Sequence, residues 1–230
     1  MGSTARPRTI VAWSSGKDSA YALHVLRQSG DLDVVALFTA LSREDDRIAM
    51  HAVRRELVHT QAARAGLPLW EVAIPSPCSN AEYDAAMRGL VDRALGVGVE
   101  VVAFGDLFLE DVRRYREERL AGTGLRPVFP LWGIPTPELA GQMLGSGLQA
   151  VLTTVDLRKL PAELAGRRWD RDLLTRLPAG VDPCGENGEF HTFVSAGPML
   201  SSPIGVEIGP PVERDGFAYA DLRPQAPSGP

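Results

Sequence analysis

Short apolar runs alternate with stretches of helical periodicity along the first two thirds of the chain, and this alternation constrains the fold most strongly. Runs typical of buried strands occur at 9–13, 34–40, 69–74 and 99–104. The helical stretches between them end at Gly30 and Gly66 or begin at a capping box over residues 79–82. Alternating strands and helices predict an α/β fold, a doubly wound parallel sheet with helices on both faces.

The character of the sequence changes after residue 125. The next expected elements are a proline-rich connector at 126–137, a helix from Thr136 and a strand at 148–155. From residue 179 onward, short β-like runs with many Gly and Pro replace the long helices. We therefore expect a first domain over 1–125 and a smaller C-terminal domain with short strands over 126–223. The tail at 224–230 carries no large apolar side chain, which predicts disorder.

The composition argues against several classes of partner. With 44% hydrophobic and 23% charged residues among 230, the chain is typical of soluble globular proteins. Its net charge of −5 gives no overall attraction to nucleic acid or to an anionic membrane. Four arginines gather on a charged helix expected at 109–120, and we interpret them as its solvated face: Arg113, Arg114, Arg116 and Arg119.

The cysteines and the N-terminus indicate a cytoplasmic protein. Cys78 and Cys184 lie far apart and neither belongs to a Cys-x-x-Cys pair, which fits a reducing compartment. The apolar run at 10–13 is too short for a signal peptide or a membrane span.

A polar turn, Ser14-Ser-Gly-Lys-Asp-Ser19, lies between the first expected strand and the helix after it. It is not a Walker A loop, because Val11 and Asp18 stand where that motif needs Gly and Ser or Thr. A turn of small residues at a helix N-terminus nevertheless exposes backbone N–H groups, which favour phosphate. Lys17, one of only two lysines among 24 basic residues, adds positive charge, and Asp18 is a candidate Mg²⁺ ligand. The alternative is an ordinary helix cap.

A second polar segment, Cys184-Gly-Glu-Asn-Gly-Glu-Phe-His191, gathers two carboxylates, an amide and an imidazole within eight residues. If a strand begins at residue 189, Glu189 and His191 share one of its faces. We interpret the segment as a substrate or catalytic loop. The alternatives are a solvated turn, or a metal site using Cys184 and His191, whose spacing is not that of a zinc finger.

Gly105 and Asp106 follow the fourth expected strand. Ligands of open parallel sheets bind at the carboxyl ends of strands, so these residues and the 14–19 turn are expected to face one crevice. A strand exit with a helix-capping Asp106 is the alternative.

Residues 10–19 resemble the PP-loop, Ser-Gly-Gly-Lys-Asp-Ser, of N-type ATP pyrophosphatases, with Ser15 in place of the middle glycine. Further segments resemble the diphthine–ammonia ligase family and its bacterial relatives: 50–57, 104–106, 130–133 and 180–192. The resemblance covers about residues 9 to 200. It implies a HUP-type α/β fold whose smaller C-terminal domain closes over an ATP crevice.

The resemblance also implies a reaction that uses ATP and Mg²⁺. A substrate carboxylate attacks the α-phosphate, pyrophosphate leaves, and ammonia or another amine displaces AMP to give an amide. Residues expected at the nucleotide are Ser14, Ser15, Gly16, Lys17, Asp18, Ser19, Thr39, Gly105 and Asp106, with Met50 and His51 as further neighbours of the adenine. Lys17, Glu186 and Glu189 are the expected catalytic residues, and Asn187, Glu189 and His191 the expected substrate contacts.

The acceptor is expected to differ from that of the diphthamide-forming members. Those members carry a segment rich in Ser, Tyr and Gln where this chain has residues 106–116. A small-molecule or protein-borne carboxylate is expected instead, with a homodimer as the candidate assembly.

Two other functions are compatible with part of the sequence. One is a HUP module that binds ATP or AMP without ligation, against which the acidic residues at 186–189 argue. The other is a tRNA-modifying thiolase of the PP-loop type, disfavoured by the acidic chain and the lack of Cys-x-x-Cys.

Overall fold

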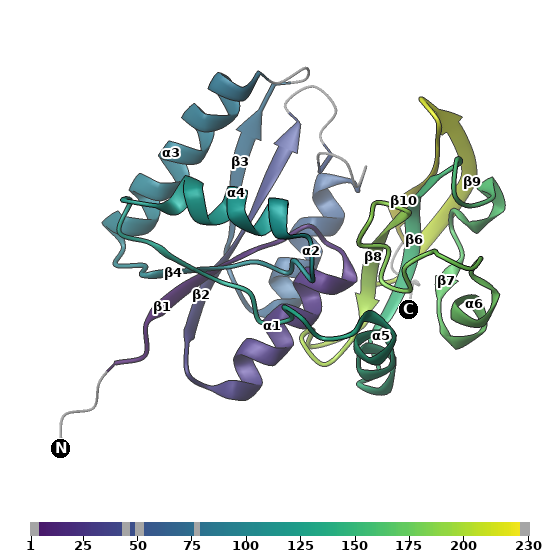
Figure 1. Cartoon of the computed structure of the whole chain (residues 1–230), viewed down its shortest axis with the longest axis horizontal. Helices are drawn as coiled ribbons and strands as arrows, with labels where there is room; N and C mark the ends of the chain where they lie inside the picture. Colours follow the sequence, from purple (N-terminus) through teal and green to yellow (C-terminus); the bar gives the residue numbers. More distant parts are fainter. Residues whose placement is uncertain (1–4, 43–46, 49–52, 76–78, 226–230) are drawn as a thin grey trace, which may run out of the picture.

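The computed structural model of the chain describes residues 5–42, 47–48, 53–75 and 79–225. It contains a parallel sheet and an antiparallel sheet that lie side by side (Figure 1). The parallel sheet has the strand order β3-β2-β1-β4-β5. Its strands are β1 (Arg8–Ala12), β2 (Asp33–Ser42), β3 (Leu69–Ile74), β4 (Val101–Ala103) and β5 (Arg126–Val128).

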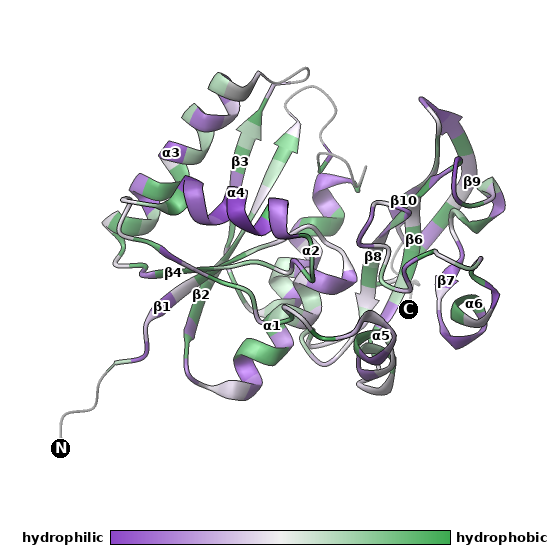
Figure 2. Ribbon diagram, viewed as in Figure 1, coloured by the Kyte–Doolittle hydropathy of each residue, from purple (hydrophilic) through white to green (hydrophobic). Residues whose placement is uncertain are grey.

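Helices cover both faces of the parallel sheet. They are α1 (Lys17–Ser29), α2 (Arg55–Ala65), α3 (Asn80–Gly96) and α4 (Glu110–Leu120). Alternate strand residues face opposite sides, so Ile10 packs with the cluster under α3 and Val11 with the cluster under α1 and α2. Figure 2 shows this arrangement as apolar strands inside and a hydrophilic α4 outside. The predicted doubly wound α/β fold is confirmed.

The second sheet is antiparallel and holds the short strands expected late in the chain. Its elements are β6 (Gln149–Asp156), β7 (Arg168–Trp169), β8 (Phe190–Ala196), β9 (Val206–Arg214) and β10 (Phe217–Pro224), with α5 (Thr136–Gly145), the 3₁₀ helix Ala162–Leu164 and α6 (Arg171–Arg176). Strand β8 pairs with β6 and also contacts the first sheet, where the Val194 amide donates to the Ser15 carbonyl at 3.0 Å. One apolar cluster runs from α1 and α2 into this sheet.

Three local predictions differ from the structure. The expected connector at 126–137 supplies β5, where Pro127 is tolerated because this edge strand pairs only with β4. Helical spacing before Gly66 runs through Met50, Val53 and Leu57 and predicts a helix from about residue 50. The helix begins at Arg55, and Met50 lies outside the described residues. The tail is expected from residue 224, but Pro224 pairs with Val206 as the last residue of β10. Residues 226–230 lie outside the described ranges, and the domain boundary after residue 125 stays a prediction.

The predicted helix ends are present. Gly30 and Gly66 adopt left-handed backbones at the ends of α1 and α2, and Ser79 and Glu82 form the capping box of α3. Across the described ranges, no helix combines the length and apolar character needed to cross a membrane.

Candidate active site

A crevice opens at the carboxyl ends of the parallel strands, beside the point where the strand order reverses between β1 and β4. Its cavity volume is about 530 Å³, within the usual range for ligand sites of about 300–1,000 Å³. Loops from both sheets line it. The first sheet contributes the 14–19 turn, Thr39 and the exit of β4, and the second sheet contributes Cys184–Glu186, Gly188 and Phe190–Thr192.

The 14–19 turn leads from β1 directly into α1. The Ser14 and Ser19 hydroxyls lie 3.1 Å apart, and Ser19 Oγ also donates to the Gly16 carbonyl at 3.0 Å. Ser15 has a left-handed backbone with φ of 69°, which explains why the PP-loop pattern carries glycine at this place. Its buried hydroxyl has no hydrogen-bond partner among the described residues. Ser15 does not line the crevice, although the other five residues of the turn do.

Strand β8 caps the start of α1. The Lys17 amide donates to Thr192 Oγ1 at 3.1 Å, so a side chain from the second sheet satisfies a free N–H of the first helical turn. Buried Gln61 in α2 donates to the carbonyls of Ser15 and Val194, at 3.0 and 2.7 Å. These contacts fix the turn between α2 and β8.

Lys17 is the most constrained cation of the site. Its side chain is 2% exposed, and Nζ donates to both carboxylate oxygens of Asp18, at 2.9 and 3.0 Å, and to the Cys184 carbonyl. Burial by itself would lower the pKa of Lys17, but the carboxylates around it, Asp18 foremost, outweigh burial and raise it. Lys17 therefore remains charged where the two sheets meet.

The exit of β4 packs tightly against the start of α1. A Cβ atom at Gly105 would lie 2.9 Å from the Asp18 carbonyl carbon and the Ser19 nitrogen, so only glycine fits there. Asp106 lines the crevice beside it and accepts a hydrogen bond from Arg116 Nε at 3.2 Å. Both residues line the crevice, as predicted from the sequence. Gly105 allows the exit of β4 to lie close to the start of α1.

Glu186 is the carboxylate of the second loop that faces the crevice. Its Oε1 accepts from the Leu107 amide at 2.8 Å, and its own amide donates to Asp182 at 2.8 Å. Burial raises the pKa of Glu186 to about 7, helped by Asp18 and Asp106 and opposed by the Leu107 amide and Lys17. A carboxyl group with this pKa exchanges protons readily at neutral pH.

Glu189 lies inside the same loop and does not line the crevice. Its Oε1 accepts from the Asp182 amide at 3.2 Å and from Asn187 Nδ2 at 3.1 Å. Its Oε2 is buried without a hydrogen-bond partner among the described residues. Asn187 is exposed and also stands outside the crevice lining. The structure thus gives Glu189 a role in closing the loop, and the predicted substrate contacts of both residues stay predictions.

His191 lines the crevice, and its contact with a substrate stays a prediction. It does not share a strand face with Glu189 as expected, because β8 begins at Phe190. Burial, assisted by Lys17, lowers the pKa of its imidazole to about 4, so His191 is neutral at physiological pH. Burial raises the pKa of the Cys184 thiol, whose Sγ donates to the Thr136 carbonyl at 3.5 Å. A protonated, buried thiol is a poor metal ligand, which argues against the Cys–His metal alternative.

The floor of the crevice beyond the turn is mainly apolar. Thr39 is buried there in the second half of β2, beside Phe38, Val72 and Phe104. This compartment suits a purine ring next to the polar turn. Met50 and His51, expected near the adenine, lie outside the described residues.

Comparison with known proteins decides the family. One family model, described as the diphthamide synthase N-terminal domain, matches residues 7–127, and another, described as the diphthamide synthase C-terminal domain, matches residues 136–217. The chain belongs to the diphthamide synthase family.

Relatives of this diphthamide synthase family member are named diphthine–ammonia ligase. The one from Danio rerio is 28% identical, over 94% of this chain and 92% of its own length. The one from Bos taurus is 26% identical, over 94% and 88%. The one from Schizosaccharomyces pombe is 29% identical over 83% of this chain but only 34% of its own length. The resemblance seen in the motifs is thereby confirmed.

The crevice of this diphthamide synthase family member fits a nucleoside triphosphate and a hard cation. A helix N-terminus and a lysine suit phosphate, and the apolar compartment suits a base. Asp18, Asp106 and Glu186 offer carboxylate oxygens. Within the described residues no three His, Cys, Asp or Glu side chains form a metal site. Mg²⁺ in nucleotide sites is commonly held by one or two carboxylates together with phosphate oxygens.

Sequence reasoning missed the residues that support the site from other elements. Asp182 and Thr192 lie within the 180–192 segment that resembles the family, but no role was predicted for either of them. Gln61 follows the helical spacing of the stretch that ends at Gly66, and this spacing alone does not distinguish it from a core residue. Its buried amide is part of a polar network. Arg116 was interpreted as part of a solvated face, yet its side chain lines the crevice.

Proposed function

We propose that this protein is an ATP-dependent ligase that activates a substrate carboxylate as its adenylate and converts it to an amide. The supporting observation is the meeting of two unlike loops in one crevice. The 14–19 turn brings a helix N-terminus and Lys17, and the second loop brings Glu186 with a pKa of about 7. Family membership and the names of the relatives support the same class of reaction.

In the first step a carboxylate oxygen of the acceptor forms a bond to the α-phosphorus of ATP. The bond from that phosphorus to the bridging oxygen of the β-phosphate breaks, and pyrophosphate leaves. Ser14, Gly16 and Ser19 are placed to hold the leaving phosphates at the start of α1, and Lys17 supplies the charge that balances them. Bound Mg²⁺ would add further charge neutralisation, with Asp18 or Asp106 as its protein ligand.

In the second step ammonia or another amine attacks the carbonyl carbon, and AMP leaves with the electrons of the broken C–O bond. The attacking nitrogen must lose a proton. Glu186 is suited to accept it, because a carboxyl group with a pKa of about 7 can take up and release a proton near neutral pH. His191, which lines the same crevice, stays uncharged and offers a neutral polar side chain there.

The direct test is product analysis. The full chain is incubated with Mg-ATP, ammonium and a panel of carboxylic acids, and nucleotides are separated. AMP and pyrophosphate that form only with an acid present support the proposal, and an acid labelled with oxygen-18 should pass one label to AMP. Acid-dependent ADP and phosphate would refute it. Tight ATP binding with no turnover for any acid would favour a nucleotide-binding HUP module.

A further inference from the structure

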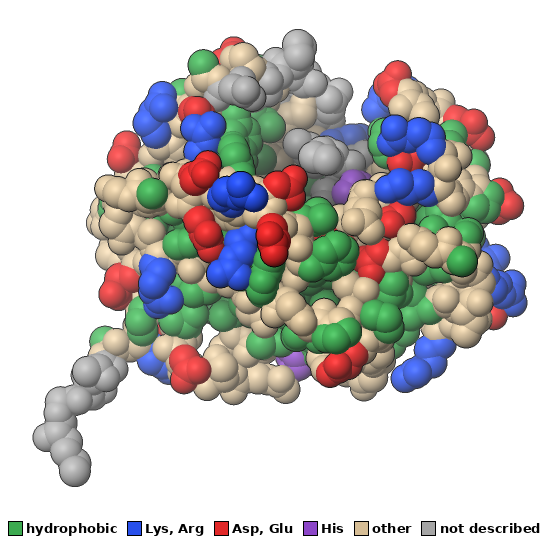
Figure 3. All heavy atoms as spheres, in the orientation of Figure 1, with side chains coloured by type: hydrophobic (Ala, Val, Ile, Leu, Met, Phe, Trp, Pro, Cys, Tyr) green, Lys and Arg blue, Asp and Glu red, His purple; other side chains and the backbone are tan. Residues whose placement is uncertain are grey.

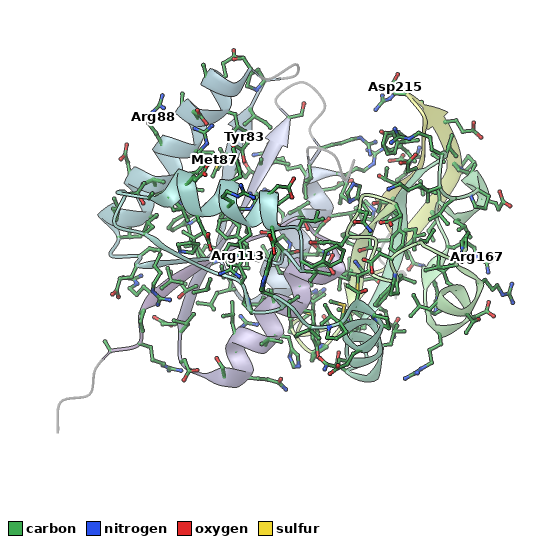
Figure 4. All side chains as sticks on the ribbon, in the orientation of Figure 1. Tyr83, Met87, Arg88, Arg113, Arg167 and Asp215 are labelled. Carbon is green, nitrogen blue, oxygen red and sulfur yellow. The ribbon has the colours of Figure 1, made fainter. Side chains whose placement is uncertain are left out.

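A groove lies between α3 and α4, outside the crevice just described, with a cavity volume of about 450 Å³. Its inner surface is apolar, with half-buried Met87 and Val91 and buried Phe104 and Leu120. Its outer rim carries exposed charges of both signs: Arg88, Asp92, Glu118 and Arg119. In Figure 4, Tyr83 and Met87 lie between α3 and α4, whereas Arg88 points outward from α3.

The groove and the crevice share one wall. Four side chains line both spaces, namely Tyr83, Met87, Phe104 and Arg116. The inner face of α4 continues this wall on the crevice side, where Val112 and Arg116 are four positions apart on one helix face. A ligand in the groove therefore contacts the same residues that bound the nucleotide crevice.

Arg116 makes two contacts at this junction. Its Nε donates to Asp106 at 3.2 Å, and its guanidinium carbon lies 4.6 Å from the centre of the Phe104 ring. The side chain is 29% exposed, so the guanidinium remains reachable. Tyr83 lines the same two spaces as Arg116. Burial raises the pKa of its hydroxyl, and Arg116 opposes this rise. A fixed fork of N–H donors suits a carboxylate.

Charge on the crevice wall limits which cation can receive an anionic acceptor. Among the described residues that line the crevice, the cationic side chains are Lys17 and Arg116. Lys17 is 2% exposed and is bonded to both Asp18 oxygens and to the Cys184 carbonyl. Arg116 is also paired, through Nε with Asp106, but its side chain is 29% exposed. An acceptor carboxylate that enters the crevice is repelled by Asp18, Asp106 and Glu186. It therefore needs a cation on the wall where it enters. Arg116 is in that position.

We propose that the α3–α4 groove binds the apolar body of a small carboxylic acid, the acceptor, and that Arg116 pairs with its carboxylate where groove and crevice join. The inference rests on the proposed ligase function and names its substrate class. The carboxylate so placed lies at the border of the crevice that receives ATP. The apolar body, an aryl or alkyl chain, replaces water against Met87, Val91 and Leu120.

The test uses 4-phenylbutyrate and its neutral analogue 4-phenylbutan-1-ol, whose binding to the full chain is measured by calorimetry or ligand-observed NMR. The acid should bind the wild type at least about tenfold more tightly than the alcohol, as a charge-assisted contact predicts. Arg116→Met should remove this preference and leave the affinity of the alcohol unchanged. Arg114→Met, an exposed arginine of the same helix, should change neither. Val91→Trp should fill the groove and weaken both ligands.

Affinity for Mg-ATP is measured in parallel, and thermal unfolding confirms that each variant is folded. Equal binding of acid and alcohol to the wild type would overturn the proposal, as would an unaffected Val91→Trp variant. A loss of ATP affinity in Arg116→Met would assign the guanidinium to the nucleotide instead. Self-association that Val91→Trp abolishes would make the groove an interface between copies. Because no turnover is measured, failure of the ligase reaction would not alter these outcomes.

Discussion

The two loops that meet in the crevice are built on opposite electrostatic principles. In the 14–19 turn, the crevice receives the start of a helix and a lysine, both positive. In the 182–192 segment, Asp182 and Glu189 hold N–H groups of their own loop, and Glu186 alone of the three lines the crevice. One loop is suited to bind anions and the other to accept a proton. The following predictions test this division, beginning with the largest effect.

Glu186→Gln should lower turnover by about 10²–10⁴-fold with little change in ATP affinity, because it removes the proposed base. For the wild type, turnover with a saturating amine should rise with pH through about 7, the pKa of Glu186. The check is a pH–rate profile together with calorimetry for ATP. A profile that is flat between pH 6 and 8 would contradict the role.

The same carboxyl group should affect stability in a defined direction. Its pKa is raised from 4.5 to about 7 on folding, so the folded state holds the proton more tightly than the unfolded chain. The contribution of Glu186 to the free energy of unfolding is therefore most favourable below about pH 4.5 and is lost as pH rises through about 7. Urea unfolding should show that the stability of Glu186→Gln relative to the wild type increases between about pH 4.5 and pH 7.

Lys17→Ala should weaken ATP binding by about ten- to a hundredfold, the loss of a charge-assisted contact. It should also destabilise the fold by about 1–3 kcal/mol, because both oxygens of Asp18 lose their partner. The cost stays below that of breaking a fully buried pair, since the Asp18 side chain is 25% exposed. Lys159→Ala is the matched control, since this exposed lysine bonds only the Asn187 carbonyl of the second loop. Unchanged ATP affinity in a folded Lys17→Ala protein would remove Lys17 from the nucleotide site.

Gly105→Ala should cost about 1–3 kcal/mol of stability and reduce ATP affinity, because the added Cβ displaces the first turn of α1. The control is Gly89→Ala in α3, where a Cβ meets nothing within 4 Å. That variant should be stabilised by up to about 1 kcal/mol through helix propensity. Thermal unfolding of both variants measures the contrast, and equal effects would show that the close approach is not constraining.

Glu189→Gln should leave ATP affinity intact and lower turnover moderately. The charge-assisted bonds from Asp182 and Asn187 become neutral ones, at a cost of about 1 kcal/mol. The loop that presents Glu186 is loosened as a result. Calorimetry and steady-state kinetics separate the two effects. A fall in ATP affinity as large as that in Lys17→Ala would end the proposed division between the loops.

Ser15→Gly should stabilise the protein by about 1 kcal/mol, the smallest change in this series. Glycine relieves the left-handed strain at φ of 69° and removes a buried hydroxyl without a described partner. Ser15→Ala retains the strain and serves as the control. Chemical denaturation should rank glycine above alanine, and the reverse order would show that the left-handed backbone costs little at this position. An alanine variant that is less stable than the wild type would show that the hydroxyl contributes to the turn.

Local sequence signals predicted the parts of the site that depend on neighbours in the chain. The 14–19 turn, the capping box and the glycine ends of α1 and α2 are set within a few residues, and the structure contains each. The strand alternation sufficed for the fold class because each apolar face must be covered. The carboxyl-end rule then placed Gly105 and Asp106 at the crevice, and they line it.

What the sequence did not reveal depends on contacts between distant segments. Glu186 and Glu189 look alike in the motif, and only the paths of their side chains separate a crevice residue from a loop-closing one. Arg116 belongs to a helix whose surface carries interspersed charges of both signs (Figure 3). Its side chain lines the crevice, and no sequence pattern distinguishes it from the other charged residues of the helix. Thr192 serves a helix that begins 175 residues earlier.

That long-range cap has a consequence for the order in which the site forms during protein synthesis. The start of α1 leaves the ribosome early, but two groups of Lys17 have partners that are synthesised much later. Its amide donates to Thr192, and its ammonium group donates to the Cys184 carbonyl. Closing so long a stretch of chain comes late in folding, after the local helices and strands. A nascent chain that has reached only residue 135 should therefore fail to retain ATP, and a separately supplied 136–230 fragment should restore binding by complementation.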